Sequence, residues 1–288
     1  MNTQIKRLED KTIEMTLSIP WGDIQKMYSE VVDDFVKETE IPGFRKGKAP
    51  RAAVEEKLDK NKVYEEVMQR IIPKVYSEAV ETEKIHPVVM PKITLTEAKE
   101  GSDWKVLAIT CERPEIVLDD YKKAVIDAKA AKQKKIWVPG EDEKKLAPSE
   151  GREDKKISLD ELLAAVSSAI KTILPAILID QEVNHLLSDL VDQTKKLGLT
   201  VEQYLTSTGR TADGIRHEYE EQAKRTLTLE FALEDIADKE GILVSDDEID
   251  TVIKTAKSAE EKASLEKQRY YLATILRRQK TIDMLANI

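Results

Sequence analysis

The spacing of apolar residues changes along this chain, and the change limits the fold more than any other feature. In residues 11–19 apolar and polar side chains alternate, which is the period of a half-buried β-strand. Two further strand-like runs cover residues 92–97 and 104–111. Between these strands, and again from residue 158 onward, apolar residues recur at helical spacing. The sequence therefore predicts an α+β N-terminal domain followed by an all-α C-terminal domain.

Residues 1–113 fit the α+β domain, because strands enclose a helical stretch that carries a loop. A helix is expected from Ile24 to about Glu38, with Asp23 as its cap. A short helix and then a longer one follow the loop. Pro73 lies within the pattern of the longer helix, so we expect a kink or a break there.

Residues 114–157 differ in composition, since prolines, glycines and charged residues interrupt them. Only a weak helical pattern lies between Leu118 and Lys135, so we expect a partly extended linker. The helical domain then covers 158–288 and opens on a capping-box sequence. Further helices are expected from about 180 to 198, from 200, from 211 to 239, after 245, and from about 263 to 285.

A basic loop lies between the first two predicted helices. Residues 43–51 contain four cations, Arg45, Lys46, Lys48 and Arg51, and no acid. The chain as a whole has a formal net charge of −9, so this tip isolates positive charge. Cations beside an exposed aromatic ring suit a nucleic-acid surface, where they meet phosphates and the ring stacks. A solvated connection between helices is the alternative for so short a basic run.

The sequence Gly-Phe-Arg-Lys-Gly-Lys-Ala-Pro at 43–50 resembles the ribosome-docking loop of bacterial trigger factor, a chaperone family that acts at the nascent-chain exit. In that family the Phe-Arg-Lys triplet contacts the large ribosomal subunit. The resemblance therefore implies that Phe44, Arg45 and Lys46 make these contacts here. The whole implied ribosome-binding set is Gly43, Phe44, Arg45, Lys46, Gly47, Lys48 and Pro50.

The helical half resembles the C-terminal body of the same family. The similarity lies in Leu-Pro-Ala-Ile-Leu-Ile-Asp-Gln-Glu at 174–182, Gly-Leu-Thr-Val-Glu-Gln-Tyr-Leu at 198–205 and Ile-Leu-Val-Ser-Asp-Asp-Glu-Ile at 242–249. Full-length members also carry a peptidyl-prolyl isomerase domain of the FK506-binding type between the two halves. Residues 114–157 are too few to bury the core of such a domain. We therefore expect that the isomerase domain is absent and that the protein is not an enzyme.

No other pattern in the sequence indicates catalysis. The three histidines lack metal-ligand spacing, and a single cysteine, Cys111, cannot complete a zinc site or form an intrachain disulfide. We expect Cys111 to be buried in a strand. The chain has no phosphate-binding or dinucleotide-binding glycine motif and no nucleophile elbow. We expect no catalytic residue, no metal and no cofactor.

The predicted protein is an elongated, multidomain, ATP-independent chaperone that docks on the RNA and protein of the large ribosomal subunit beside the tunnel exit. It would shield apolar segments of unfolded nascent polypeptides. No apolar run reaches the length of a membrane span and no secretory signal is visible, so we expect a cytoplasmic, partly ribosome-bound protein without a membrane partner.

Three alternatives stay open: a free cytoplasmic or periplasmic-type holdase, a prolyl isomerase, and an RNA-binding module without clients. Whether molecules off the ribosome form a homodimer also stays open.

Overall fold

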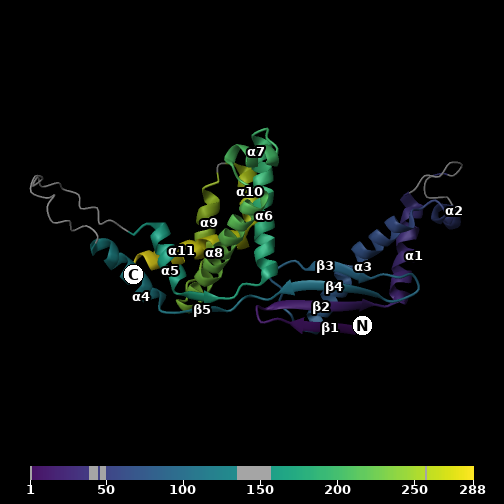
Figure 1. Cartoon of the computed structure of the whole chain (residues 1–288), viewed down its shortest axis with the longest axis horizontal. Coiled ribbons are helices and arrows are strands. Elements are labelled where there is room, and N and C mark those ends of the chain that lie inside the picture. The colour runs from purple at the N-terminus through teal and green to yellow at the C-terminus, as the bar shows by residue number, and fades with distance from the viewer. Residues whose placement is uncertain (1, 39–44, 46–49, 135–156, 257) are drawn as a thin grey trace, which may run out of the picture. The chain divides into compact units, whose positions relative to one another are not determined.

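The computed structural model describes residues 2–38, 45, 50–134, 157–256 and 258–288. The chain divides into two compact units, and each is described by itself (Figure 1). The first unit comprises residues 1–113 and 175–180, and the second comprises 114–174 and 181–288. The first is α+β and the second is mainly helical, which confirms the predicted fold class.

The first unit is an antiparallel sheet with helices, and its strands have the order β1-β2-β4-β3. Its described elements are β1 (Asn2–Arg7), β2 (Thr12–Ile19), α1 (Trp21–Glu38), α2 (Arg51–Glu55), α3 (Lys60–Thr82), β3 (Lys92–Glu97) and β4 (Trp104–Cys111). β3 and β4 have the predicted bounds. β1 was not predicted, because Ile5 is its only apolar residue and a single position sets no period.

Alternate side chains of β2 and β4 form the centre of the first core. Met15 pairs with Ala108 and Leu17 with Val106, and all four side chains are buried. α1 and α3 pack against each other and supply most of the other side chains in this core. The sheet therefore fixes α1, which precedes the basic loop in the sequence, and α3, which comes after α2.

Two details of these helices differ from the prediction. α1 begins at Trp21 rather than after Asp23, and the main-chain N–H of Trp21 donates to Oδ1 of Asp103 at 2.9 Å. Asp103 lies in the turn between β3 and β4. A residue distant in the sequence therefore accepts a hydrogen bond from a main-chain N–H at the start of α1 that has no partner within the helix. α3 is continuous from residue 60 to 82 with Pro73 inside it, so the predicted break does not occur.

The second unit contains two short paired strands and most of the helices. Its described elements are β5 (Ile116–Leu118), α4 (Tyr121–Lys134), α5 (Leu159–Ser168), β6 (Ile170–Thr172), α6 (Ala176–Lys196), α7 (Val201–Thr208), α8 (Ala212–Lys239), α9 (Asp246–Lys254), α10 (Ala259–Lys267) and α11 (Arg269–Ala286). The division between the units places residues 176–180 of α6 in the first unit.

Residues 114–134 are packed into the unit, whereas their composition suggested a partly extended linker; α4 lies where the weak helical pattern was expected. β5 pairs with β6, and α4 packs against α5. Tyr121 and Val125 of α4 are buried in one core with residues of α5, α8 and α11. The phenolic O–H of Tyr121 donates to Glu240 at 2.6 Å, which ties α4 to the end of α8. The rest of the predicted linker, residues 135–156, lies outside the described residues.

The helix caps of the second unit follow the sequence closely. The predicted capping box at Ser158 is present, and Thr200 and Ser245, where helices were expected to begin, form capping boxes too, each with its partner three residues later. Gly241 has a φ of 65° directly after α8, which is the left-handed conformation that ends helices. The final predicted helix is two helices, because α10 ends before Gln268 and α11 begins after it.

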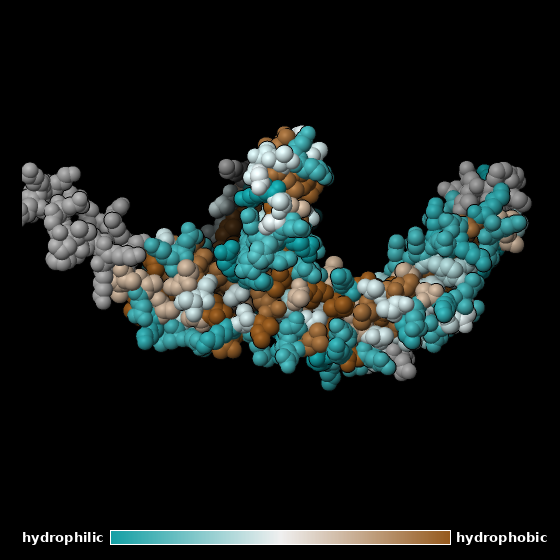
Figure 2. All heavy atoms as spheres, in the orientation of Figure 1, coloured by the Kyte–Doolittle hydropathy of each residue, from teal (hydrophilic) through white to brown (hydrophobic). Residues whose placement is uncertain are grey.

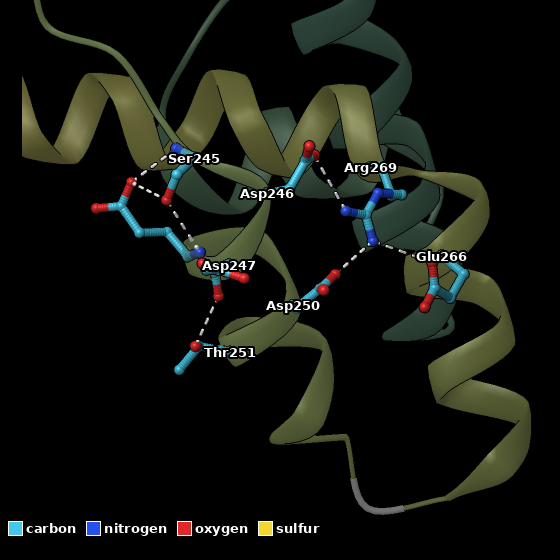
Figure 3. A network of polar contacts seen from close by, with 8 residues as sticks. Ser245, Asp246, Asp247, Asp250, Thr251, Glu266 and Arg269 are labelled. Atoms are coloured by element: carbon cyan, nitrogen blue, oxygen red, sulfur yellow. Dashed lines mark hydrogen bonds and ion pairs between the residues drawn. The ribbon is translucent and has the colours of Figure 1, made fainter.

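A set of ion pairs joins α9, α10 and α11 (Figure 3). The guanidinium of Arg269 contacts Asp250 at 2.6 Å, and Asp246 and Glu266 at 3.3 Å each. Nearby, Glu248 accepts hydrogen bonds from the main-chain N–H of Ser245 and from Nζ of Lys280, both at 2.8 Å. The apolar core under this network consists of Ile249, Ile253 and Leu272 with their neighbours.

If α4 is part of the helical core, shortening the buried side chain of Val125 will destabilise the protein. Val125→Ala should lower the free energy of unfolding by about 2 kcal/mol, since it removes buried methyl groups and leaves a cavity. Ile126→Ala is the matched control, because Ile126 is 49% exposed, and its effect should stay below about 0.5 kcal/mol. Urea unfolding followed by circular dichroism measures both. Equal effects would contradict the packing of α4.

The capping carboxylate of α9 predicts a pH dependence of stability. The hydrogen bond from Lys280, and then the cap at Ser245, lower the pKa of Glu248 from 4.5 to about 2. A carboxyl whose pKa is lower in the folded state stabilises the fold at pH values above its unfolded-state pKa. This stabilisation is lost as the pH falls toward 2, where the carboxyl becomes protonated in the folded state too. Glu248→Gln should therefore be less stable than the wild type at pH 7, and the difference should shrink between pH 5 and pH 2.

Urea midpoints across this pH range test the prediction. Asp247→Asn is the control, since it removes a neighbouring carboxylate that forms no ion pair within the described residues. A wild-type advantage over Glu248→Gln that stays constant down to pH 2 would show that the Lys280 contact does not hold the charge.

Candidate functional site

The predicted docking loop is only partly covered by the structure. Five of its seven predicted binding residues, Gly43, Phe44, Lys46, Gly47 and Lys48, lie outside the described residues. The other two, Arg45 and Pro50, are described, and both are exposed. The geometry of the site therefore comes from the helices on either side of the loop.

Pro50 starts the helix that follows the loop. Its φ of −60° and ψ of 136° place it at the cap position of α2, and its carbonyl oxygen accepts from the N–H groups of Ala53 and Val54 at 3.0 and 3.3 Å. Proline suits this position, because it has no N–H of its own to satisfy and its φ is already fixed. Pro50 thus has a structural role that the loop motif alone did not reveal.

α2 is short, and two contacts hold it in place. The side chain of Val54 is completely buried against Val36, Ala53 and Leu58. The guanidinium of Arg51 donates to Oδ1 of Asp33 at 3.0 Å and to Oγ of Ser29 at 2.9 Å, both on α1.

Arg51 is therefore engaged in attaching α2 to α1. Of the four cations that the sequence placed at the tip, Arg51 is thus held within the protein and Arg45 is exposed, whereas Lys46 and Lys48 lie outside the described residues. Sequence reasoning missed the role of Arg51, because its partners Asp33 and Ser29 lie 18 and 22 residues earlier.

A second set of contacts joins α1 to α3 below the loop. The guanidinium of Arg70 donates to Asp34 at 2.7 Å and to Glu66 at 2.8 Å, and Lys37 contacts Asp34 at 2.9 Å. The bonds from Arg70 and Lys37 hold the pKa of the Asp34 carboxyl below its usual value. α1 and α3 are therefore fixed to each other by charge pairs as well as by their apolar core.

The helical unit has a different kind of candidate surface. Figure 2 shows brown, apolar residues on its surface among hydrophilic ones. On α11, Tyr270 is 88% exposed, Tyr271 62% and Ile275 45%. Tyr271 and Ile275 are one helical turn apart and so lie on the same side of α11. Both residues fall within the final predicted helix, about 263 to 285, but the sequence did not show that they stay exposed.

Other candidate sites that the sequence considered have little support in the described residues. They contain no group of three or more His, Cys, Asp or Glu side chains placed to hold a metal ion. Among them, no helix has the length and apolar character of a membrane span. Cys111 is buried in β4 as predicted, and burial raises the pKa of its thiol to about 11, so the thiol is protonated near neutral pH.

Comparison with known families accounts for nearly the whole chain. Residues 1–138 match the family described as bacterial trigger factor protein, and residues 143–287 match the family described as the C-terminus of the same protein. The first match contains the loop with α1 to α3. The second contains the exposed residues of α11.

Individual relatives agree with these matches. The chain is 32% identical over 113 residues to trigger factor of Staphylococcus epidermidis, which covers 39% of this chain and 26% of that relative. It is 24% identical over 420 positions to trigger factor of Carboxydothermus hydrogenoformans, covering 99% and 98% of the two chains. This chain has 288 residues, so well over a hundred of those positions have no counterpart in it.

A solved structure of the trigger factor chaperone has a similar fold. It superposes with a TM-score of 0.62 at 13% identity and covers 100% of this chain and 99% of its own. At that identity the similarity concerns the fold.

Proposed function

The chain belongs to the bacterial trigger factor family, and from this premise we propose that it is a chaperone that docks on the large ribosomal subunit and shields nascent polypeptides. The observation that carries the proposal is the sequence of residues 43–50 between α1, which belongs to the core of the first unit, and α2, which Val54 and Arg51 attach to α1. Residues 1–113 would dock, and the helical domain over 158–288 would bind clients. Residues 114–157 would connect them, with residues 114–134 packed against the helices.

Docking is supported by the way the tip is attached. Val54 and Arg51 hold α2, and Arg70 holds α3 against α1, so both ends of the loop leave from fixed positions. A loop with fixed ends loses less conformational entropy on binding than a free one. Its cations lie within a chain of net charge −9, so attraction to RNA would be confined to the tip.

Client binding is supported by the exposed apolar residues of the helical unit. Tyr270, Tyr271 and Ile275 offer aromatic and aliphatic area without a deep pocket. Scattered contacts of this kind bind many sequences weakly, which allows release without ATP. Because these residues belong to the second unit, they also favour the alternative function, a holdase that works without ribosome docking.

We propose further that the protein has no prolyl isomerase activity. The two family matches leave only residues 139–142 between them, which is far too little for a folded domain. The chain would then act on nascent polypeptides by binding alone, in the same compartment as ribosomes.

The docking proposal predicts the effect of removing the triplet. Replacing Phe44, Arg45 and Lys46 together by alanine should abolish co-sedimentation with bacterial 70S ribosomes while leaving the circular dichroism spectrum unchanged. Because Arg51 is engaged within the protein, three cations remain to meet phosphates. Wild-type affinity should therefore fall with salt concentration by a power of about three at most.

The control is Lys74→Ala with Lys92→Ala, which removes two exposed positive charges from the same unit outside the loop. This variant should bind like the wild type. Ribosome binding by the triple-alanine variant would refute the docking assignment. If neither the wild type nor the control binds, while both suppress aggregation of an unfolded protein, the off-ribosome holdase is the better proposal.

A refolding assay separates the chaperone from an isomerase. Slow prolyl isomerisation limits the refolding of many proteins, and a prolyl isomerase accelerates that phase. Added at catalytic amounts, this protein should leave the slow rate constant unchanged, with a known prolyl isomerase as the positive control. Acceleration that increases with concentration would show that an isomerase activity is retained.

A further inference from the structure

A cavity lies between α1 and α3, directly before the docking loop in the sequence. Its volume is about 380 Å³, within the range of sites that hold small ligands or inserted side chains. Val31 and Phe35 of α1 form its apolar part. Val31 is completely buried, whereas Phe35 is half-buried and so presents part of its ring to the cavity.

The charged groups around this cavity are unequal in number. Asp34, Glu38 and Glu66 line it with carboxylates, against the cations Lys37 and Arg70. Both cations are already engaged, Arg70 with Asp34 and Glu66, and Lys37 with Asp34.

Glu38 differs from the other charged residues of this cavity. It is exposed, it lies one helical turn after Phe35, and it forms no ion pair or hydrogen bond within the described part of the chain. Among the described residues, one negative charge beside an aromatic ring is thus left unpaired. The cavity has one carboxylate more than its two cations, and it has room for an aliphatic stem.

We propose that this cavity receives a lysine or arginine side chain of a basic protein that adjoins the docking site on the large ribosomal subunit. The aliphatic stem would lie on the exposed part of the Phe35 ring, as long cationic side chains do on apolar surfaces. The cationic end would meet the carboxylate of Glu38 and the face of the Phe35 ring. The inference rests on the proposed docking function and adds a protein contact to the RNA contact of the loop.

Charge decides between a protein and RNA as the occupant. A phosphate placed here would face three carboxylates, and the two cations of the cavity are already paired with Asp34 and Glu66. Like charges repel, so a phosphate is disfavoured. The basic tip, which begins a few residues later, has the opposite character. The two neighbouring surfaces would therefore bind two chemically different parts of the same partner.

Glu38→Gln tests the inference because the two occupants predict changes of opposite sign. With a cationic side chain in the cavity, the variant should bind ribosomes about three- to tenfold more weakly, which corresponds to roughly 0.7–1.4 kcal/mol. The exponent of the salt dependence should stay unchanged, since no phosphate contact is lost. With RNA beside Glu38, removing the negative charge would strengthen binding.

Glu30→Gln is the matched control. It removes the same charge from an exposed glutamate of α1 that does not line the cavity, so it should bind like the wild type. Co-sedimentation with 70S ribosomes at several salt concentrations measures all three proteins. Affinity of Glu38→Gln equal to or above that of the wild type, or an equal loss in Glu30→Gln, would overturn the inference.

The outcome for the docking function is read separately. If Glu38→Gln binds like the wild type while the Phe44/Arg45/Lys46 variant does not bind, docking stands and the cavity has no role in it. If the wild type itself does not bind, both proposals fail. Circular dichroism of Glu38→Gln should match the wild type, because Glu38 is exposed at the end of α1.

Discussion

The first unit depends on one shared core, in which β2 and β4 pack against α1 and α3. Met15, Leu17, Val106 and Ala108 are buried at its centre, and the sheet register fixes where the helices lie. The loop of residues 39–49 starts where α1 ends and finishes where α2 begins. Its first end is therefore held by this core, and its second end by the attachment of α2 to α1 through Val54 and Arg51. A contact surface at the tip could thus be used without reorganising the fold.

The charges at this end of the molecule have two distinct roles. Arg51 and Arg70 lie close to acids of α1 and attach α2 and α3 to it. Surface ion pairs of this kind contribute little stability one by one, and their main effect here is to fix geometry. By contrast, Arg45 is exposed, and Glu38 forms no ion pair within the described residues. A sum of charges over the sequence cannot separate these roles, because the separation depends on which residues meet in space.

Sequence periodicity predicted what local physics determines. The bounds of β3 and β4 and the three capping boxes follow from residues within a few positions of each other. The missed features depend on distant partners. Asp103 satisfies the start of α1, and Tyr121 contacts Glu240, which makes α4 part of a core. For the candidate site, the motif predicted the loop, but the attachment of Arg51 to α1 required the structure.

The packing of α4 bears on where this fold could accept or lose an insertion. α4 and α5 pack against each other in one core with α8 and α11, and residues 135–156 connect them in the sequence. The end of α4 and the start of α5 are thus both anchored in this core. An insertion at such a place adds little to the cost of closing the loop and disturbs no core contact, and its loss is equally mild. The helical unit can therefore keep its fold with a short connection at a position where a longer chain would carry a further domain.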